Sequence, residues 1–343
     1  MRTLTQALKD GNDLKKKDVT AAAEALLDEE VNNRDKGAFL TALAEKGETP
    51  DEIAAFVQVF LKHAVDSKIR PASAPGPMID VCGTGGDSLD LFNISTAATF
   101  ILAAGGAAVV KHGNRAVTSK SGGMDVLEAL GVPIDLTPTV LAKNFRKHGL
   151  AFMFAPQYHP AFKAVVQVRK NLAKKGIKTI FNKLGPLLNP AKPAYQLLGV
   201  YDPALVRPFA EILQKLGRKG AWVVHGSDEE GNGMDEISIM GMTRLSKFNE
   251  GDIMDLNINP RAFGIPTAKM KNLKGGDAKV NAKIIMNILD GTDRGAKRDM
   301  VAVNAGAGFV ITGIAPDFAA GVALAKELLI SGEAMDKLKA MQS

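Results

Sequence analysis

Two glycine-rich turns in the first half of the chain have the residue types and spacing of a phosphate-binding site. The first, at residues 83–87, follows a short apolar run and precedes the start of an apolar helix at 93–96. The second follows another apolar run and extends from Lys111 to Gly123 through a stretch that contains Ser, Thr and Gly. Glycines let backbone N–H groups approach an anion, and a helix N-terminus adds unpaired donors and the positive end of a dipole. We therefore expect both turns to bind phosphate groups.

A pair of neighbouring carboxylates, Asp235 and Glu236, follows a glycine-rich acidic stretch at 226–233. Neighbouring residues on a regular strand point to opposite faces, so both carboxylates can serve one substrate only if the chain turns there, which the glycines allow. Hard oxygen ligands suit Mg²⁺, which keeps several waters and bridges to substrate phosphates. On its own, such a pair is more typical of a solvated loop, and only its sequence context favours a metal site.

Arg169, His112 and Cys82 each allow a chemical and a structural interpretation. The planar fork of Arg169 suits a carboxylate, but an arginine in a predicted helix can also simply face solvent. His112 is a candidate general base, although a role in orienting the backbone of its loop is favoured. Cys82, at the end of a predicted strand, is more typical of a buried small hydrophobe than of a catalytic thiol.

The composition is that of a globular protein with a large core, since 46% of the 343 residues are hydrophobic and 23% are charged. The 43 Lys and Arg against 37 Asp and Glu give a net charge of +6, which suits an anionic substrate. Three tyrosines and one tryptophan offer few platforms for base stacking. The composition thus weighs against binding of single-stranded nucleic acid.

The sequence predicts a cytoplasmic protein that does not enter a membrane. Cys82 is the only cysteine, so no disulfide can form within the chain, which fits a reducing compartment. The N-terminus lacks the apolar core of a signal peptide. The longest apolar stretch, at 97–110, is interrupted by Gly105 and Gly106 and is too short to span a bilayer.

A proline-rich linker at 71–77 separates two regions of different character. Residues 1–70 are predicted to be helical, and Thr49 to Glu52 form a capping box before an amphipathic helix. Beyond the linker, short apolar runs alternate with helical patterns. The predicted strands are 78–82, 107–111, 151–155, 195–200 and 220–225, with antiparallel strands added within 240–248. The predicted helices are 94–104, 124–130, 138–148, 203–216, 280–290 and 316–331. The expected fold class is α/β, with a mostly parallel central sheet flanked by helices and a smaller all-helical N-terminal domain.

A series of sequence blocks makes the chain similar to the anthranilate phosphoribosyltransferase family, whose fold is related to that of nucleoside phosphorylases. The blocks are GTGGD at 83–87, NIST at 93–96, KHGNR at 111–115, SGGMDVLEALGV at 121–132, APQYHPAFKAVVQVRK at 155–170, TIFNKLGPLLNP at 179–190 and MDEIS at 234–238. The resemblance implies a glycosyltransferase of tryptophan biosynthesis. It would transfer the phosphoribosyl group of 5-phosphoribosyl 1-diphosphate to the amino group of anthranilate and release pyrophosphate.

The same resemblance implies how the domains and cofactors are organised. It implies a helical domain at 1–70 that also contains a returning segment at about 163–192, and an α/β domain at 71–343 that binds the phosphoribosyl diphosphate. It implies a homodimer that forms through the helical domain. It further implies Mg²⁺ as the cofactor, with two ions in each active site.

The resemblance also assigns residues to the parts of the site. The pocket for the phosphoribosyl diphosphate comprises Gly83, Gly86, Asp87, Asn93, Ile94, Ser95, Thr96, Lys111, His112, Gly113, Asn114, Arg115, Ala116, Val117, Thr118, Ser119 and Gly123. Magnesium is assigned to Ser95, Asp235 and Glu236. The carboxylate of anthranilate is assigned to Arg169, with Tyr158 and His159 at the border of the acceptor pocket. Because Pro160 suits a first helical position, a local structural role for His159 is equally favoured. No residue is implied as a certain acid or base; the catalytic candidates are Lys111, beside phosphate oxygens, and Asn114, between the two substrates.

Three positions depart from the commonest pattern of the family. Leu91 stands where Thr is usual, Gly123 where many members have Ser, and Met124 where Ala is usual. The hydroxyl missing at position 91 removes one hydrogen bond to the ligand, which is worth about 0.5–1.5 kcal/mol. These departures leave open the alternative that the protein is a paralogue that uses another aromatic acceptor. A pyrimidine nucleoside phosphorylase of related fold is a second alternative, and a noncatalytic nucleic-acid-binding relative, suggested by the isoelectric point of about 9.2, is a third.

Overall fold

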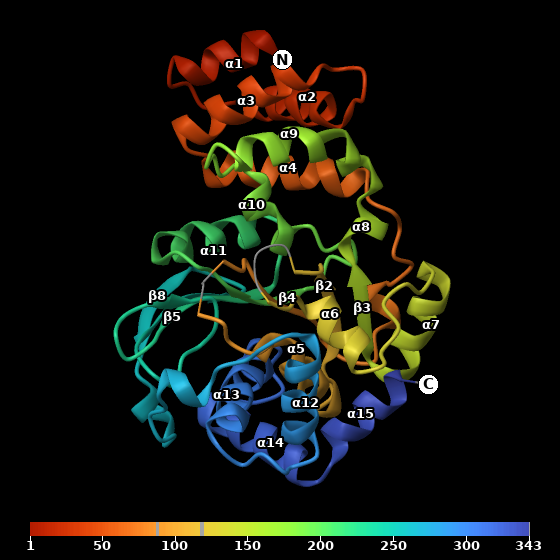
Figure 1. Cartoon of the computed structure of the whole chain (residues 1–343), viewed down its shortest axis with the longest axis vertical. Coiled ribbons are helices and arrows are strands. Elements are labelled where there is room, and N and C mark those ends of the chain that lie inside the picture. The colour runs from red at the N-terminus through yellow and green to blue at the C-terminus, as the bar shows by residue number, and fades with distance from the viewer. Residues whose placement is uncertain (87–88, 117–119, 343) are drawn as a thin grey trace.

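The computed structural model describes residues 1–86, 89–116 and 120–342 and shows a helical layer stacked on an α/β body (Figure 1). The helical layer contains α1 (Arg2–Lys9), α2 (Lys16–Leu27), α3 (Asn33–Lys46) and α4 (Pro50–Lys62). Helix α9 (Lys163–Ala173) returns from the α/β body and packs on α2 and α3. The helical layer is therefore built from two segments that lie far apart in the sequence.

The predicted capping box at the start of α4 is confirmed. The Thr49 hydroxyl accepts a hydrogen bond from the Glu52 N–H at 3.2 Å, and the Glu52 carboxylate accepts one from the Thr49 N–H at 2.9 Å. The same carboxylate is buried and accepts hydrogen bonds from the Leu14 N–H and the Lys46 ammonium. One glutamate thus caps α4 and ties it to the neighbouring helices of the layer.

The central sheet is mostly parallel, as predicted, with the strand order β3-β2-β1-β4-β5-β7-β8. Its strands are β1 (Met78–Gly83), β2 (Ala108–Gly113), β3 (Leu150–Phe154), β4 (Tyr195–Gly199), β5 (Gly220–Ser227), β6 (Gly233–Met234), β7 (Thr243–Asn249) and β8 (Met254–Ile258). The strands from β3 to β5 are parallel, whereas β6 and β7 pair with β5, and β8 pairs with β7, in antiparallel fashion. All the predicted strands are present, and β7 confirms the antiparallel addition expected within 240–248.

Helices cover both faces of the sheet (Figure 1). The apolar core of one face is shared with α5 (Ile94–Ala104), α6 (Gly123–Ala129), α12 (Ala278–Leu289), α13 (Ala296–Ile311), α14 (Phe318–Ile330) and α15 (Glu333–Met341). On the other face, α11 (Val206–Lys215) packs between β5 and α4, so that the helical layer and the sheet share one core. Helix α7 (Pro138–His148) packs on β3 at the sheet edge, and the short helices α8 (Ala155–Tyr158) and α10 (Phe181–Leu184) flank α9 in the chain. None of the helices in the described ranges is long and apolar enough to cross a membrane.

Helices α13 and α15 are present in addition to those predicted from the sequence. Helix α13 is buried along nearly its whole length, so it shows no amphipathic stripe. Its glycines permit very close packing, since a Cβ at Gly306 would lie 2.8 Å from the Val322 nitrogen on α14, and one at Gly308 would lie 2.6 Å from a Leu102 methyl on α5. A helix rich in small residues that packs against helices on one side and the sheet on the other carries little periodic signal.

The strand order places a topological switch point between β1 and β4. From β1 the chain first builds β2 and β3 on one side of the sheet, and then β4 and β5 on the other. In open α/β sheets, ligands bind in the crevice beyond the carboxyl ends of strands at such a point. The turn at 83–87 begins at the end of β1, so the fold brings the predicted phosphate site to this crevice.

Candidate active site

The carboxyl ends of β1 and β4 meet at Asp235. A Cβ at Gly83, the last residue of β1, would lie 2.1 Å from Asp235 Oδ2, and a Cβ at Gly199, the last residue of β4, would lie 1.6 Å from the Asp235 carbonyl oxygen. Glycine at both positions leaves the space that Asp235 occupies. Its Oδ2 accepts a hydrogen bond from the Gly85 N–H at 2.7 Å. The carboxylate is therefore fixed against the first glycine turn.

The neighbouring Glu236 reaches the start of α5. Strand β6 ends at Met234 and the chain bends at Asp235 and Glu236, which is the turn that the sequence analysis required. Glu236 Oε1 accepts a hydrogen bond from the Ser95 N–H at 3.1 Å. The two carboxylates thus join both elements predicted to hold phosphate, the glycine turn and the helix start.

Lys111 lies at the junction of β1, β2 and α5. Its side chain is almost fully buried, and its ammonium donates to the Val81 carbonyl at 2.6 Å and to the Ser95 hydroxyl at 3.1 Å. The sequence predicted an ammonium beside phosphate oxygens. The structure places it underneath the site, where it supplies positive charge and orients Ser95.

The second turn is closed by Asp125 at the start of α6. One oxygen of Asp125, Oδ2, accepts hydrogen bonds from the Ala116 N–H at 2.8 Å and from the Gly122 N–H at 2.9 Å. The Asn114 carbonyl accepts a longer hydrogen bond from the Met124 N–H at 3.4 Å. The turn is thus folded back onto the helix that follows it. The sequence analysis did not single out Asp125, although its place three residues after Gly122 is a capping signal.

Asn93 links the first turn to the second. Its amide nitrogen donates to the Ser121 carbonyl at 3.2 Å, and its amide oxygen accepts from the Asn281 side chain at 2.8 Å. Asn281 lies on α12, 188 residues away in the sequence. Nothing in the local pattern around Asn281 indicated a site residue, so the sequence analysis missed it.

The remaining residues of the predicted donor pocket fall into three groups. Asp87, Val117, Thr118 and Ser119 lie outside the described residues. Gly86, Asn114 and Arg115 are exposed on the turns, whereas Ile94 and Thr96 are buried. The Arg115 guanidinium pairs with Glu128 on α6.

The three departures from the family pattern have local packing roles. Leu91 packs on the core beneath the first turn and forms an isolated bridge with Lys274. A Cβ at Gly123 would lie 3.2 Å from the Thr96 hydroxyl, so a side chain there requires a small adjustment. Met124 is fully buried, and its terminal methyl lies 3.1 Å from the place of a Cβ at Gly113. Met124 therefore fills the space under the glycine that ends β2.

Arg169 on α9 is available for an anion. Its guanidinium lies over the Phe181 ring, 5.0 Å from the centroid, and it makes no ion pair with any residue in the described part of the chain. Burial lowers the pKa of Arg169, a sign that its charge lacks full hydration. A half-buried guanidinium held by an aromatic ring suits a planar carboxylate.

Two histidines, His112 at the end of β2 and His159 just before α9 in the chain, contact one another. The rings of His112 and His159 meet edge to face, with centroids 5.2 Å apart. Burial, together with the charge of His159, lowers the pKa of His112 to about 3, and burial also lowers the pKa of His159. His159 Nε2 contacts the Leu188 carbonyl at 2.9 Å. Both imidazoles are therefore neutral at pH 7, and its low pKa makes His112 a weak proton acceptor, which favours the structural interpretation of His112 over a general base.

Cys82 and Tyr158 are buried. Burial raises the pKa of the Cys82 thiol and raises the pKa of Tyr158 to about 12. The buried thiol is thus held in its protonated form at neutral pH, which favours the structural interpretation of Cys82.

The oxygen atoms of Asp235, Glu236 and Ser95 suit Mg²⁺ better than a softer metal ion. Within residues 1–86, 89–116 and 120–342, no group of three or more His, Cys, Asp or Glu side chains could hold a metal ion. This donor set fits an ion that a few protein oxygens hold together with waters and substrate phosphates.

Comparison with known proteins gives the family of the chain. Residues 75–335 match the α/β domain of a glycosyl transferase family, and residues 2–64 match the helical bundle domain of that family. A protein named anthranilate phosphoribosyltransferase from Desulfatibacillum aliphaticivorans is 45% identical over 98% of this chain and 96% of its own length. The chain belongs to the anthranilate phosphoribosyltransferase family.

Solved structures of anthranilate phosphoribosyltransferases share the whole architecture. The enzyme from Thermus thermophilus has a TM-score of 0.90 and 38% identity, over 99% of this chain and 98% of its own. The Saccharomyces cerevisiae enzyme in complex with PRPP and Mg has a TM-score of 0.85 and 27% identity, over 99% and 96%. A further structure of the yeast enzyme is in complex with 4-fluoroanthranilate. The family expected from the sequence blocks is thus confirmed, rather than that of the pyrimidine nucleoside phosphorylases.

Proposed function

We infer that this protein transfers the phosphoribosyl group of 5-phosphoribosyl 1-diphosphate to the amino nitrogen of anthranilate, which gives N-(5-phosphoribosyl)anthranilate and pyrophosphate in tryptophan biosynthesis. The observation that carries this conclusion is the junction at the switch point, where Asp235 and Glu236 meet the backbone N–H groups of Gly85 and Ser95. Backbone donors and hard oxygen ligands around one glycine turn suit a diphosphate that binds with magnesium.

We place the donor diphosphate between the two turns. The N–H groups at the start of α5 and the buried charge of Lys111 favour the negative charge that develops on the leaving group. Asp235, Glu236 and Ser95 would hold Mg²⁺, with two ions in each site, and the bound ions would supply positive charge near the departing pyrophosphate. Asn114, exposed on the second turn, is the candidate for contact with both substrates.

We place anthranilate on the side of Arg169. Its carboxylate would bind the guanidinium that stacks on Phe181. The amine attacks the anomeric carbon from the face opposite the leaving pyrophosphate. An aryl amine is a neutral nucleophile at pH 7, so the reaction needs no strong base, in agreement with the low pKa of His112. The protein then acts mainly through positioning and electrostatics.

The assembly of the enzyme is a further part of this proposal. The helical domain, with the returning α9, would close over the sheet and exclude water that competes for the ribosyl cation. We propose that the protein is a cytoplasmic homodimer that pairs through this domain. Val166, whose side chain is exposed on α9, offers apolar surface for such a contact. Light scattering after size exclusion tests the dimer, and Val166→Lys should shift it toward monomer.

The proposed reaction is tested by following anthranilate fluorescence with 5-phosphoribosyl 1-diphosphate and Mg²⁺. We expect the fluorescence of anthranilate to fall in the presence of the protein, and this fall to require both 5-phosphoribosyl 1-diphosphate and Mg²⁺. Arg169→Ala should lower kcat/KM for anthranilate by about 100-fold, and Arg169→Lys should restore only part of it because an ammonium lacks the bidentate fork. Unchanged turnover in Arg169→Ala would remove this residue from the acceptor site.

Two controls decide against the alternatives. Turnover of uridine or thymidine with phosphate, without turnover of anthranilate, would identify a nucleoside phosphorylase. Glu236→Gln should abolish the Mg²⁺-dependent signal, whereas Glu230→Gln, a change to an exposed acid in the preceding loop, should leave it unchanged. Equal loss in both variants would point to a general effect of charge rather than to a metal site.

A further inference from the structure

A set of buried polar side chains lies between the sheet and the segment that leads back into β4. Asn189 in this segment is fully buried, and its amide nitrogen donates to Asp80 Oδ2 at 2.9 Å and to the Val110 carbonyl at 2.7 Å. Its amide oxygen accepts a hydrogen bond from the Ala191 N–H at 3.0 Å. One side chain thus joins β1, β2 and the returning chain, and a buried amide with these partners is costly to remove.

A second contact of the same kind lies on the neighbouring strand. Gln196 on β4 is fully buried, and its amide nitrogen donates to the Pro186 carbonyl at 2.7 Å. Its amide oxygen accepts a hydrogen bond from Arg218 Nε at 3.1 Å. Polar side chains of the sheet therefore hold both ends of the segment 186–189.

Asp80 is the acidic member of this set. Burial raises the pKa of its carboxyl to about 6, while the Asn189 hydrogen bond and the charges of Lys111 and Arg218 act in the opposite direction. A buried carboxylate is tolerated only with compensating partners. Position 189 therefore needs a donor, and an amide supplies one to Asp80 and one to the Val110 carbonyl.

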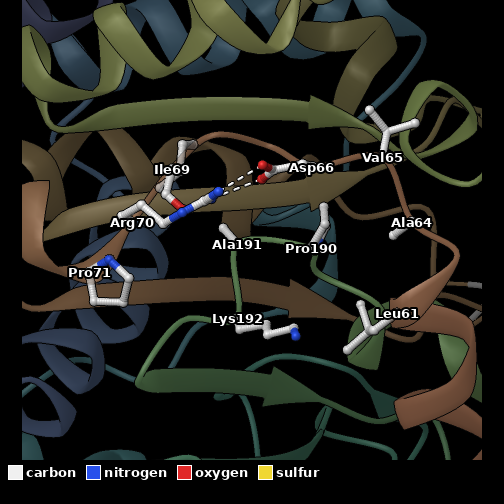
Figure 2. Close-up of a pocket in the computed structure, with 10 residues that line it drawn as sticks. All are labelled: Leu61, Ala64, Val65, Asp66, Ile69, Arg70, Pro71, Pro190, Ala191 and Lys192. Carbon is white, nitrogen blue, oxygen red and sulfur yellow. Dashed lines mark hydrogen bonds and ion pairs between the residues drawn. The ribbon is translucent and has the colours of Figure 1, made fainter.

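Just beyond Asn189, the returning chain at 190–192 borders open space. A cavity of about 400 Å³ lies between Pro190–Lys192 and the connector that leads from α4 to β1 (Figure 2). On that connector, Arg70 pairs with Asp66 through hydrogen bonds of 2.8 and 2.7 Å, as Figure 2 shows. The cavity thus separates residues 190–192 from the connector between α4 and β1. The returning chain is held on its other side, where Asn189 forms hydrogen bonds to the sheet.

The segment 185–188 carries groups on the acceptor side of the site. The Leu188 carbonyl contacts His159 Nε2 at 2.9 Å, and the backbone of Gly185 interacts with the His112 ring. The two imidazoles contact each other, and His159 stands four residues before the start of α9, which carries Arg169. His159 also stacks on Phe162, which meets the Phe181 ring that lies under Arg169, so a shift of this segment would reach the proposed anthranilate site through these rings.

We propose that Asn189 is a positioning residue for the acceptor side of the reaction. Together with Asp80 it fixes the segment 185–188, and with it His112 and His159, relative to the phosphate turns. Asn189 touches no reacting atom in this arrangement and acts through the segment alone. The inference rests on the proposed phosphoribosyl transfer, so turnover by the wild-type protein is established first.

The test is the steady-state kinetics of Asn189→Ala, with anthranilate and 5-phosphoribosyl 1-diphosphate varied separately. We expect KM for anthranilate to rise about 10-fold or more, because a small misplacement of a binding wall has effects of this size, while KM for the diphosphate changes by less than about threefold. Ser246→Ala is the matched control. It removes a buried hydroxyl that donates to Asp255 at the antiparallel edge of the sheet, and both KM values should stay as in the wild type.

A second set of variants separates positioning from stability. Asn189→Asp puts a carboxylate beside Asp80 and should raise KM for anthranilate at least as much as Asn189→Ala. Adding Asp80→Asn supplies an amide that can donate to the new carboxylate and should restore part of the lost KM. The proposal is overturned by folded Asn189→Ala with an unchanged KM for anthranilate, by an equal rise of both KM values, or by failure of Asp80→Asn to rescue Asn189→Asp. Lack of turnover by the wild-type protein refutes the proposed function instead.

Discussion

Asp235 and Gly85 are joined by a hydrogen bond of 2.7 Å from the backbone N–H of the glycine to Oδ2 of the acid, across 150 residues of sequence. The same oxygen lies 2.1 Å from the place of a Cβ at Gly83. The end of β1 is therefore shaped around this carboxylate, since one glycine gives the space and another gives the donor. A side chain at Gly83 would therefore displace the proposed metal ligand, whereas at Gly85 there is open space and it is the positive φ of 69° that favours glycine.

We predict that Gly83→Ala lowers kcat/KM by about 100-fold, the loss expected when a reacting or binding group moves by roughly 1 Å. The new methyl group must displace Asp235, so the Mg²⁺ concentration for half-maximal activity should rise as well. Gly251→Ala, in the turn between β7 and β8, is the control because its nearest neighbour would be 4.0 Å away. Wild-type activity in Gly83→Ala would show that Asp235 need not lie where the structure places it.

The buried ammonium of Lys111 should matter for the donor substrate. Lys111→Met keeps the apolar stem but removes the hydrogen bonds to the Val81 carbonyl and the Ser95 hydroxyl. Hydrogen bonds from a charged group are worth about 1.5–3 kcal/mol, so we expect KM for 5-phosphoribosyl 1-diphosphate to rise about 10- to 150-fold. Initial rates at saturating anthranilate give this value. A larger rise in KM for anthranilate than for the diphosphate would contradict the placement of Lys111 under the phosphate site.

The depressed pKa of His112 predicts a pH dependence of stability. In the folded protein the ring stays neutral down to about pH 3, whereas its ordinary pKa is 6.5. Between these values the unfolded state binds more protons, so the contribution of His112 is present above pH 6.5 and is lost as the pH falls. Asp80 makes the opposite contribution to the pH dependence. Its folded-state pKa of about 6 lies above the ordinary 3.8, so its contribution to stability is present below pH 3.8 and is lost as the pH rises towards 6.

The comparison that isolates His112 is urea unfolding of the wild type and His112→Asn at several pH values from 4 to 7.5. As the pH rises through this range, the free energy of unfolding should increase more in the wild type than in the variant. The reason is that only the wild type has an imidazole that is protonated in the unfolded state and neutral in the folded state. A difference that is constant with pH would mean that His112 titrates normally. Between pH 6.5 and 8, the pH profile of kcat/KM should have the same shape in the wild type and in His112→Asn, because His112 does not ionise in this range.

The local parts of the site were predictable from the sequence because they are contiguous. The apolar run before Gly83, the turn and the helix start at Asn93 form one strand-turn-helix unit, and Lys111 follows the same pattern on the next strand. The turn at Asp235 was predictable from its glycines, since two adjacent acids on a straight strand would face apart.

The long-range partners of these units were not predictable in the same way. Asn281 supports Asn93 from a helix that lies 188 residues further along the chain, and Asn189 meets Asp80 across 109 residues. A single asparagine carries no periodic signal, and its value depends on which groups the fold leaves buried beside it. The close approach of Asp235 to Gly199 is equally invisible until the order of β1 and β4 is known.

The closure of the second turn by Asp125 gives the last prediction. Asp125 Oδ2 accepts the Ala116 and Gly122 N–H groups and so holds both ends of the turn that we place over the diphosphate. Asp125→Ala removes a charged acceptor from two backbone donors, a loss of about 1–3 kcal/mol, and should raise KM for the diphosphate about 5- to 150-fold. Glu128→Ala, one turn further along α6, breaks only the exposed pair with Arg115 and should change KM by less than about threefold. An equal rise of KM for the diphosphate in the two variants would mean that the charge of α6, rather than the closed shape of the turn, governs binding. Added salt would then reduce the rise in KM to the same extent in both variants.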